Sequence, residues 1–128
     1  MIKVYVSKQS NYPISSPAIK NHLRGFLKDK GIVSDSEVTV AIVSDKKMLD
    51  IANKYMKDDK VHNVLSFSDS EVDKKFVYPP SGIMSLGEIV ICYSQAVKEA
   101  KKENKLIKDK VNELVEHGAL HLLGFHHE

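Results

Sequence analysis

Residues 86–92 read Leu-Gly-Glu-Ile-Val-Ile-Cys and form the most strand-like stretch of the chain. Ile89, Val90 and Ile91 follow one another, so both faces of this stretch are apolar. Such runs of β-branched residues are typical of a strand that is covered on both faces of its sheet. We therefore expect a sheet that buries residues 86–92, with Cys92 as a buried strand residue rather than a metal ligand.

The rest of the chain alternates between strand and helix patterns. β-Branched or alternating stretches predict three more strands, and apolar residues that recur every three or four positions predict four helices. The first half of the chain is expected to form a strand at 2–6, a helix with Ile19, Leu23, Phe26 and Leu27 inward that stops at Gly31, and a strand at 37–43. A helix capped by Ser44 or Asp45 should follow, with Met48, Ile51, Ala52 and Tyr55 inward. After it we expect a short strand at 62–67, a loop at 68–82, the strand at 86–92, a helix capped by Ser94 that runs to about Asn104, and a last helix that carries histidines.

The order and the length of these elements indicate the fold class. A chain of 128 residues suits one domain with its own core, so we expect residues 1–128 to form a single domain. Strands and helices mixed in this order predict an α+β fold. We expect a single mixed sheet of about four strands with helices packed on it.

The composition is that of an ordinary globular protein. Hydrophobic residues make up 42% of the chain and charged residues 28%, and no apolar run is long enough to span a bilayer. The first residues alternate like a strand and lack the apolar region of a secretory signal, and the single cysteine suits a reducing compartment. We expect a cytoplasmic protein without a membrane partner. The net charge of +2, with acids mixed among the lysines, does not by itself indicate nucleic-acid binding.

The last twelve residues, 117–128, read His-Gly-Ala-Leu-His-Leu-Leu-Gly-Phe-His-His-Glu. On a helix His117 and His121 stack one turn apart and can bind one ion. Gly124 can adopt the left-handed conformation that ends a helix, so that His127 can approach as a third ligand, with His126 as the alternative. Three neutral imidazoles with a fourth position for water make a catalytic type of zinc site. We therefore expect a metal site at the end of the C-terminal helix.

Histidines at a terminus can also belong to an affinity tag. Here they are interrupted by apolar residues and preceded by a core-facing stripe that includes Val111, Leu114 and Val115. The final helical turn is apolar almost all round, so we expect it to be buried. Buried imidazoles need partners, and a metal ion supplies them better than water does.

The spacing also matches the metzincin proteases, in which His-Glu-x-x-His-x-x-Gly-x-x-His binds zinc and the glutamate acts as general base. Gly118 stands at the position of that glutamate. Glu116 does not replace it, because on a helix it points about 100° away from His117. A zinc-dependent peptidase or amide hydrolase is therefore the least favoured function.

The chain resembles the YbeY-type rRNA maturation endoribonucleases, whose signature is His-Gly-x-Leu-His-Leu-x-Gly-Tyr-Asp-His. Residues 117–127 match this signature, with Phe125 for the tyrosine and His126 for the aspartate. Residues 62–67 resemble the family's Thr-Asn/Asp-Val-Leu-Ser-Phe strand with His62 for the threonine. Residues 86–91 resemble its Leu-Gly-Asp-Ile-Val-Ile strand with Glu88 for the aspartate. Three motifs in the same order make the resemblance specific.

The resemblance implies a metal-dependent endoribonuclease that cuts single-stranded RNA in ribosomal RNA maturation, including processing of the 16S rRNA 3′ end. It implies His117, His121 and His127 as ligands of one Zn²⁺ per chain, with other divalent metal ions as alternatives. The implied partners are single-stranded rRNA, the small ribosomal subunit and its assembly factors, and no DNA is expected.

One departure from the family pattern concerns catalysis. Met56 stands where the family has an arginine after the tyrosine, and a thioether cannot clamp a phosphate as a guanidinium does. Lys57 or Lys60 can replace the charge but not its fork geometry. The alternative function is therefore a metal-stabilised ribosome assembly factor with weak or no cleavage. No catalytic group is assigned beyond the metal-bound water.

Several other residues near the motifs allow a structural and a functional interpretation. Glu88 can orient a ligand imidazole or pair with a lysine. For Ser66 we favour a structural role in its strand, and for His22 and His62 a place on the surface without a function.

Overall fold

The computed structural model describes residues 1–68 and 83–124. Their elements are, in order, β1 (Ile2–Lys8), α1 (Ser16–Asp29), β2 (Ser36–Val43), α2 (Asp45–Ile51), the π-helical turn η1 (Ala52–Met56), β3 (Val64–Phe67), β4 (Met84–Cys92), α4 (Tyr93–Glu103) and α5 (Ile107–Leu122). This order agrees with the sequence prediction, and most boundaries differ by a few residues. The predicted loop at 68–82 lies outside the described residues except for its first residue.

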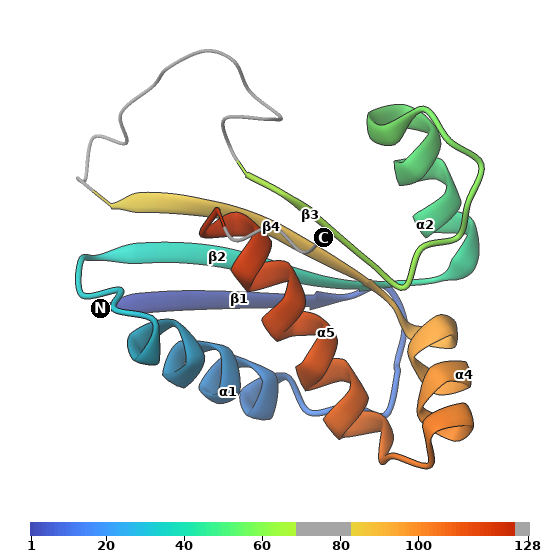
Figure 1. Ribbon diagram of the computed structural model, residues 1–128, viewed down its shortest axis with the longest axis horizontal. Helices are drawn as coiled ribbons and strands as arrows, with labels where there is room; N and C mark the ends of the chain where they lie inside the picture. Colours follow the sequence, from blue (N-terminus) through green and yellow to red (C-terminus); the bar gives the residue numbers. More distant parts are fainter. Residues whose placement is uncertain (69–82, 125–128) are drawn as a thin grey trace.

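The described strands form one sheet in the order β1-β2-β4-β3 (Figure 1). β2 pairs in parallel with both β1 and β4, whereas β3 pairs antiparallel with β4. The sheet is therefore mixed, and the predicted α+β class with about four strands is confirmed. β3 is one of the two edge strands of this sheet.

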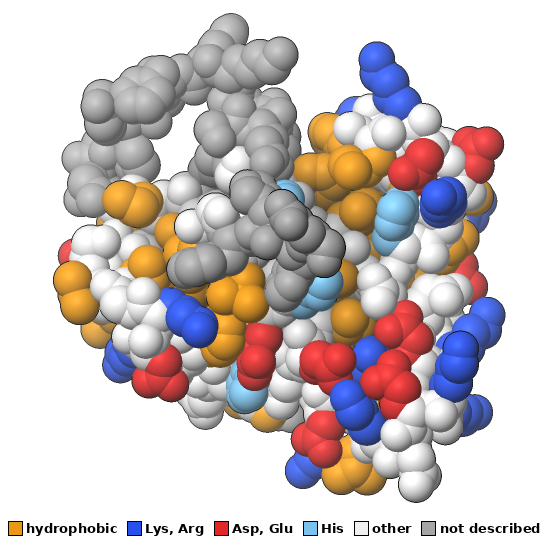
Figure 2. Space-filling model, in the orientation of Figure 1, with side chains coloured by type: hydrophobic (Ala, Val, Ile, Leu, Met, Phe, Trp, Pro, Cys, Tyr) orange, Lys and Arg blue, Asp and Glu red, His pale blue; other side chains and the backbone are white. Residues whose placement is uncertain are grey.

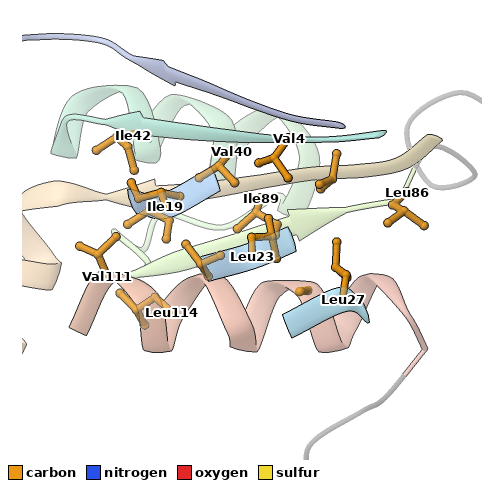
Figure 3. Packing of buried hydrophobic residues seen from close by; sticks show 14 of the residues in the cluster. Val4, Ile19, Leu23, Leu27, Val40, Ile42, Leu86, Ile89, Val111 and Leu114 are labelled. Carbon is orange, nitrogen blue, oxygen red and sulfur yellow. The ribbon is translucent and has the colours of Figure 1, made fainter. Parts of the chain in front are cut away.

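Strand β4 is buried on both faces, as its sequence predicts. Ile89 and Ile91 belong to the larger core cluster, which includes residues of α1 and α5, and their exposed fraction is 0%. Figure 3 shows side chains of this cluster, Ile89 among them, between the sheet and the two helices. Val90 and Cys92 point to the opposite face and pack with Met48 and Ala52. We call the face that carries Ile89 the α5 face and the face that carries Val90 the α2 face.

Two of the expected helix caps differ in outcome. The Ser44 hydroxyl accepts a hydrogen bond from the backbone N–H of Lys47 at 3.2 Å and caps α2, as predicted. The predicted cap by Ser94 is wrong, because α4 begins one residue earlier, at Tyr93, and its cap makes no side-chain hydrogen bond. The Ser94 hydroxyl instead donates to the carboxylate of Asp45, which lies at the start of α2. A tertiary contact has therefore replaced the local one.

The helix predicted around Met48–Tyr55 changes type partway along. It is α-helical to Ile51 and continues as the π-helical turn η1, after which Lys57 takes a left-handed φ of 54°. A π-turn holds more residues than an α-turn, so the α-helical spacing no longer applies beyond it. Tyr55 is consequently 46% exposed instead of facing inward, and the prediction for this residue is wrong.

Among the described residues, no helix has the length and apolar character that a membrane span requires.

Candidate metal centre

Helix α5 lies close against strand β4 because glycine occupies the contact. A Cβ atom on Gly118 would lie 2.7 Å from Cγ2 of Ile89, a distance that real Cβ atoms do not reach. On β4, a Cβ on Gly87 would lie 2.2 Å from the carbonyl oxygen of Phe67, and its φ is +129°. Only glycine fits both positions without displacing its neighbours. These two glycines bring the last turns of α5 down onto β3 and β4.

His117 and His121 both lie within α5, one turn apart, as their spacing predicts. The helix ends at Leu122, and Gly124 has the left-handed φ of 92° that the sequence predicts for the residue that ends it. The expectation that this last turn is buried is only partly correct. His117 is exposed and His121 is half-buried, because α5 contacts the sheet along one side only.

Ser66 supplies a contact that the sequence interpretation underrated. Its hydroxyl oxygen lies 2.6 Å from Nδ1 of His121. Ser66 pairs with Ile89 across the two strands, so both side chains point to the α5 face. When Nδ1 carries the ring proton, it donates to the Ser66 hydroxyl and Nε2 becomes the metal-binding nitrogen. A polar residue on the inner face of an apolar strand was the signal that pointed to this contact.

The donor set fits a metal ion that binds nitrogen ligands. Two imidazoles one turn apart, one of them oriented by a hydroxyl through its other nitrogen, have the form of ligands in zinc sites. The predicted third ligand His127 and its alternative His126 lie outside the described residues. Within residues 1–68 and 83–124, no group of three or more His, Cys, Asp or Glu side chains is placed to hold a metal.

Cys92 is a buried strand residue, as predicted. Burial raises the pKa of its thiol, and the nearby carboxylate of Asp45 raises it further. The thiol is 3.0 Å from Asp45 Oδ1, to which it donates. A protonated, buried thiol is a poor metal ligand, because the thiolate is the form that binds.

Glu88 points away from the histidines. Side chains alternate along β4, so Glu88 lies on the α2 face, opposite to its neighbour Ile89 and to Ser66. There it lines a hollow together with Tyr55 and Phe67. A direct hydrogen bond from the ring N–H of His117 or His121 to the Glu88 carboxylate does not fit this placement.

The two histidines that we expected to be ordinary surface residues both have acidic partners. His22 Nε2 on α1 lies 2.5 Å from Glu116 Oε2, next to His117 on α5, and its side chain is only 36% exposed. The sequence separation of 94 residues hid this pair. His62 precedes β3 and lies 3.1 Å from Asp58, and it contributes, after the backbone N–H of Lys60, to lowering the pKa of that carboxyl.

The position of the family arginine is half-exposed and lies at the end of η1. Met56 is 49% exposed there. Arg24 is the only arginine of the chain, and it lies on α1, where it donates to the carbonyl oxygen of Ile2 at 3.0 Å and to Asn21 at 3.1 Å. The only guanidinium of the chain therefore lies on α1 and not at the end of η1.

Comparisons with known proteins agree with these features. The family model described as Endoribonuclease YbeY matches residues 5–128. Two proteins called Endoribonuclease YbeY are similar in sequence. The one from Bartonella quintana is 38% identical over 91% of this chain and 70% of its own length, and the one from Francisella philomiragia is 32% identical over 98% and 78%.

A solved structure shows the same fold. The solution structure of a Thermotoga maritima protein superposes with a TM-score of 0.59, covering 98% of this chain and 75% of that one at 23% identity. The family model spans nearly the whole chain, including both histidines of α5 and the strand that carries Ser66. This chain belongs to the endoribonuclease YbeY family.

Proposed function

We propose that this protein is a metal-dependent endoribonuclease that cuts single-stranded ribosomal RNA during maturation, including the 3′ end of 16S rRNA. The observation that carries the proposal is the 2.6 Å contact between Ser66 and His121, because it orients one imidazole of the family's histidine motif as a ligand requires. In this proposal the protein works in the cytoplasm with the small ribosomal subunit and its assembly factors as partners.

The metal in this proposal is one Zn²⁺ ion per chain, held by His117, His121 and His127. Imidazole nitrogens are common zinc ligands, although they also bind other divalent first-row metals. A zinc ion in such a site supplies Lewis acidity and lowers the pKa of water to about 7.

The chain's own residues prepare this site. In this proposal the Nδ1–H of His121 donates a hydrogen bond to the Ser66 hydroxyl, which keeps the ring in one orientation and leaves Nε2 for the metal. Gly118 allows α5 to approach Ile89 closely enough for this contact. The contact between His22 and Glu116 joins α1 to α5 one residue before His117.

The test measures metal content and RNA cleavage on the same preparations. We expect His121→Ala to lose both together, whereas the control His62→Ala retains both, because His62 pairs with Asp58 and is not part of α5. Cleavage that persists in metal-free His121→Ala would contradict the proposal. The RNA ends identify the nucleophile, since a 2′,3′-cyclic phosphate reports attack by the ribose hydroxyl instead of water.

A ribosome assembly factor with weak or no cleavage is the second candidate. Two observations favour it. Met56 stands half-exposed at the arginine position, and the only arginine of the chain, Arg24, lies on α1 and donates to the carbonyl oxygen of Ile2. Binding to the small subunit without metal-dependent cutting of any rRNA fragment would support this candidate over the first.

A peptidase is disfavoured by packing as well as by sequence. A glutamate at position 118 would place its Cβ 2.7 Å from Ile89, so the general base of the metzincins has no room here.

A further inference from the structure

A hollow of 270 Å³ lies on the α2 face of the sheet, between α2 with η1 and the strands β3 and β4. Its apolar part includes Val90, Phe67 and Ile51, and the first two of these are buried. It lies on the face of the sheet opposite to Ser66 and His121, so it is distinct from the place where the two described histidines of α5 lie. Figure 2 shows hydrophobic side chains gathered beside α2, at the upper right of the molecule.

An exposed aromatic ring stands at this hollow. The ring centroids of Tyr55 and Phe67 are 5.2 Å apart and their planes are tilted by 53°. Tyr55 remains 46% exposed, because η1 displaces it from the inward stripe of its helix. Lys54 Nζ lies 5.2 Å from the Tyr55 centroid. A half-exposed tyrosine with an adjacent cation is the kind of platform on which unpaired bases stack.

The charged groups of the hollow balance each other. Lys47 and Lys54 contribute two cations, and Asp50 and Glu88 contribute two carboxylates. A bare phosphate would meet both carboxylates, and a purely apolar ligand would leave all four charges without partners. A nucleotide satisfies every group, since its base offers a flat face to Tyr55 and amino donors to the carboxylates, while its phosphates meet the lysines.

The edge position of β3 connects the hollow with the metal site. Consecutive residues of a strand point to opposite faces, so Ser66 faces His121 and Phe67 faces the hollow. Within the described sheet, β3 has a partner strand on one side only. A single strand of RNA that passes around this edge can reach both places.

We propose that this hollow, which we call the base pocket, binds one unstacked base of the RNA strand, next to the position that is cut. The proposal rests on the proposed function and adds where a neighbouring nucleotide is held. Carboxylates accept hydrogen bonds, so the base pocket prefers bases that carry an amino group over uracil.

The test measures the Kd of metal-free protein for 5′-labelled cytidine and uridine hexanucleotides by fluorescence anisotropy. We expect Tyr55→Ala to weaken binding by about 5- to 150-fold, the range for loss of one base–aromatic stack. The matched control is Tyr5→Ala, because Tyr5 is also half-exposed, at 49%, but lies on β1 at the other edge of the sheet. Equal Kd values for Tyr55→Ala and the unmodified protein would overturn the proposal, as would no binding by the unmodified protein.

A second variant tests the base preference. The two hexanucleotides are matched in size. Cytosine carries an amino group where uracil carries a carbonyl oxygen. We expect the unmodified protein to bind the cytidine oligomer more tightly, and Glu88→Gln to reduce this difference, because an amide can also donate to uracil. Tighter binding of the uridine oligomer by the unmodified protein would overturn it. These measurements need no cleavage, so their failure is distinguishable from that of the endoribonuclease proposal, which the His121→Ala experiment tests.

Discussion

The hydroxyl oxygen of Ser66 lies 2.6 Å from Nδ1 of His121, although the two residues are 55 positions apart in the chain. The contact joins the edge strand β3 to the last full turn of α5. The contact holds the ring of His121 in one orientation through Nδ1, so that Nε2 stays available for a metal ion. Hydrogen bonds to metal-binding histidines commonly have this effect.

Ser66→Ala is therefore expected to weaken zinc binding by about 10- to 100-fold, the usual effect of losing such a partner. Competition with a chromophoric chelator measures the affinity. Ser66→Thr retains the hydroxyl and should keep most of the affinity. Ser85→Ala is the control, because Ser85 lies on the neighbouring strand β4 and is also half-buried. An unchanged zinc affinity in Ser66→Ala would show that the contact does not orient the ligand.

Gly118→Ala is expected to destabilise the protein. The added Cβ would lie 2.7 Å from Ile89 Cγ2, and overpacking costs about 1–3 kcal/mol, which outweighs the gain of up to about 1 kcal/mol from replacing a helical glycine. Gly25 on α1 is the matched control, because a Cβ there meets nothing within 4 Å. Gly25→Ala should therefore raise the free energy of unfolding, measured in urea, by about 0.5–1 kcal/mol. Stabilisation by both substitutions would contradict the close contact between α5 and β4.

An ion network around the buried Lys110 joins α4 to α5, and we expect its contribution to stability to depend on pH. Lys110 is 4% exposed and its Nζ lies 2.9 Å from Glu103 and 3.3 Å from both Glu99 and Glu113. Burial lowers the pKa of Lys110, but the hydrogen bonds with the glutamates outweigh it and the net pKa is raised. Figure 2 shows the mixed acidic and basic side chains at the lower right. Lys110→Met is expected to cost about 2 kcal/mol at neutral pH.

The pH dependence of this network has two limits. Hydrogen bonds from Lys110 and Lys105 lower the pKa values of Glu103 and Glu113. The two carboxylates therefore contribute to the free energy of unfolding above the ordinary pKa of glutamate, and this contribution is lost as the pH falls through the lowered values. The raised pKa of Lys110 means that its own contribution persists until the pH rises above the usual range for lysine. The stability difference between Lys110→Met and the unmodified protein should therefore shrink in acid. A difference that stays constant below about pH 4 would contradict the network.

Met56→Arg is expected to raise RNA cleavage, by roughly 10- to 100-fold, if the step is limited by the charge that develops on the phosphate. A guanidinium at this half-exposed position offers two parallel donors to a phosphate, which neither Lys54 of η1 nor Lys57 after it can do. The control is Met84→Arg, because Met84 is exposed to a similar extent, at 55%, but lies at the start of β4. Single-turnover cleavage rates distinguish the two. Equal gains from both substitutions would point to general attraction for RNA.

The amino-acid sequence alone predicted the features that depend on residues close together in the chain. The strand at 86–92, the helical spacing of His117 and His121 and the left-handed Gly124 all follow from periods of two or 3.6 residues and from local backbone preferences. The prediction that Tyr55 faces inward was wrong for a local reason, because the π-helical turn changes the residue spacing partway along the helix.

Only the tertiary structure decided which distant side chains meet. The pairs Ser66 with His121 and His22 with Glu116 join residues 55 and 94 positions apart. Glu88 belongs to one of the three family motifs, yet it faces the opposite side of the sheet from Ser66. Such contacts depend on strand register and on how closely a helix packs on a sheet. Both are set by the whole core at once, and no short stretch of residues contains that information.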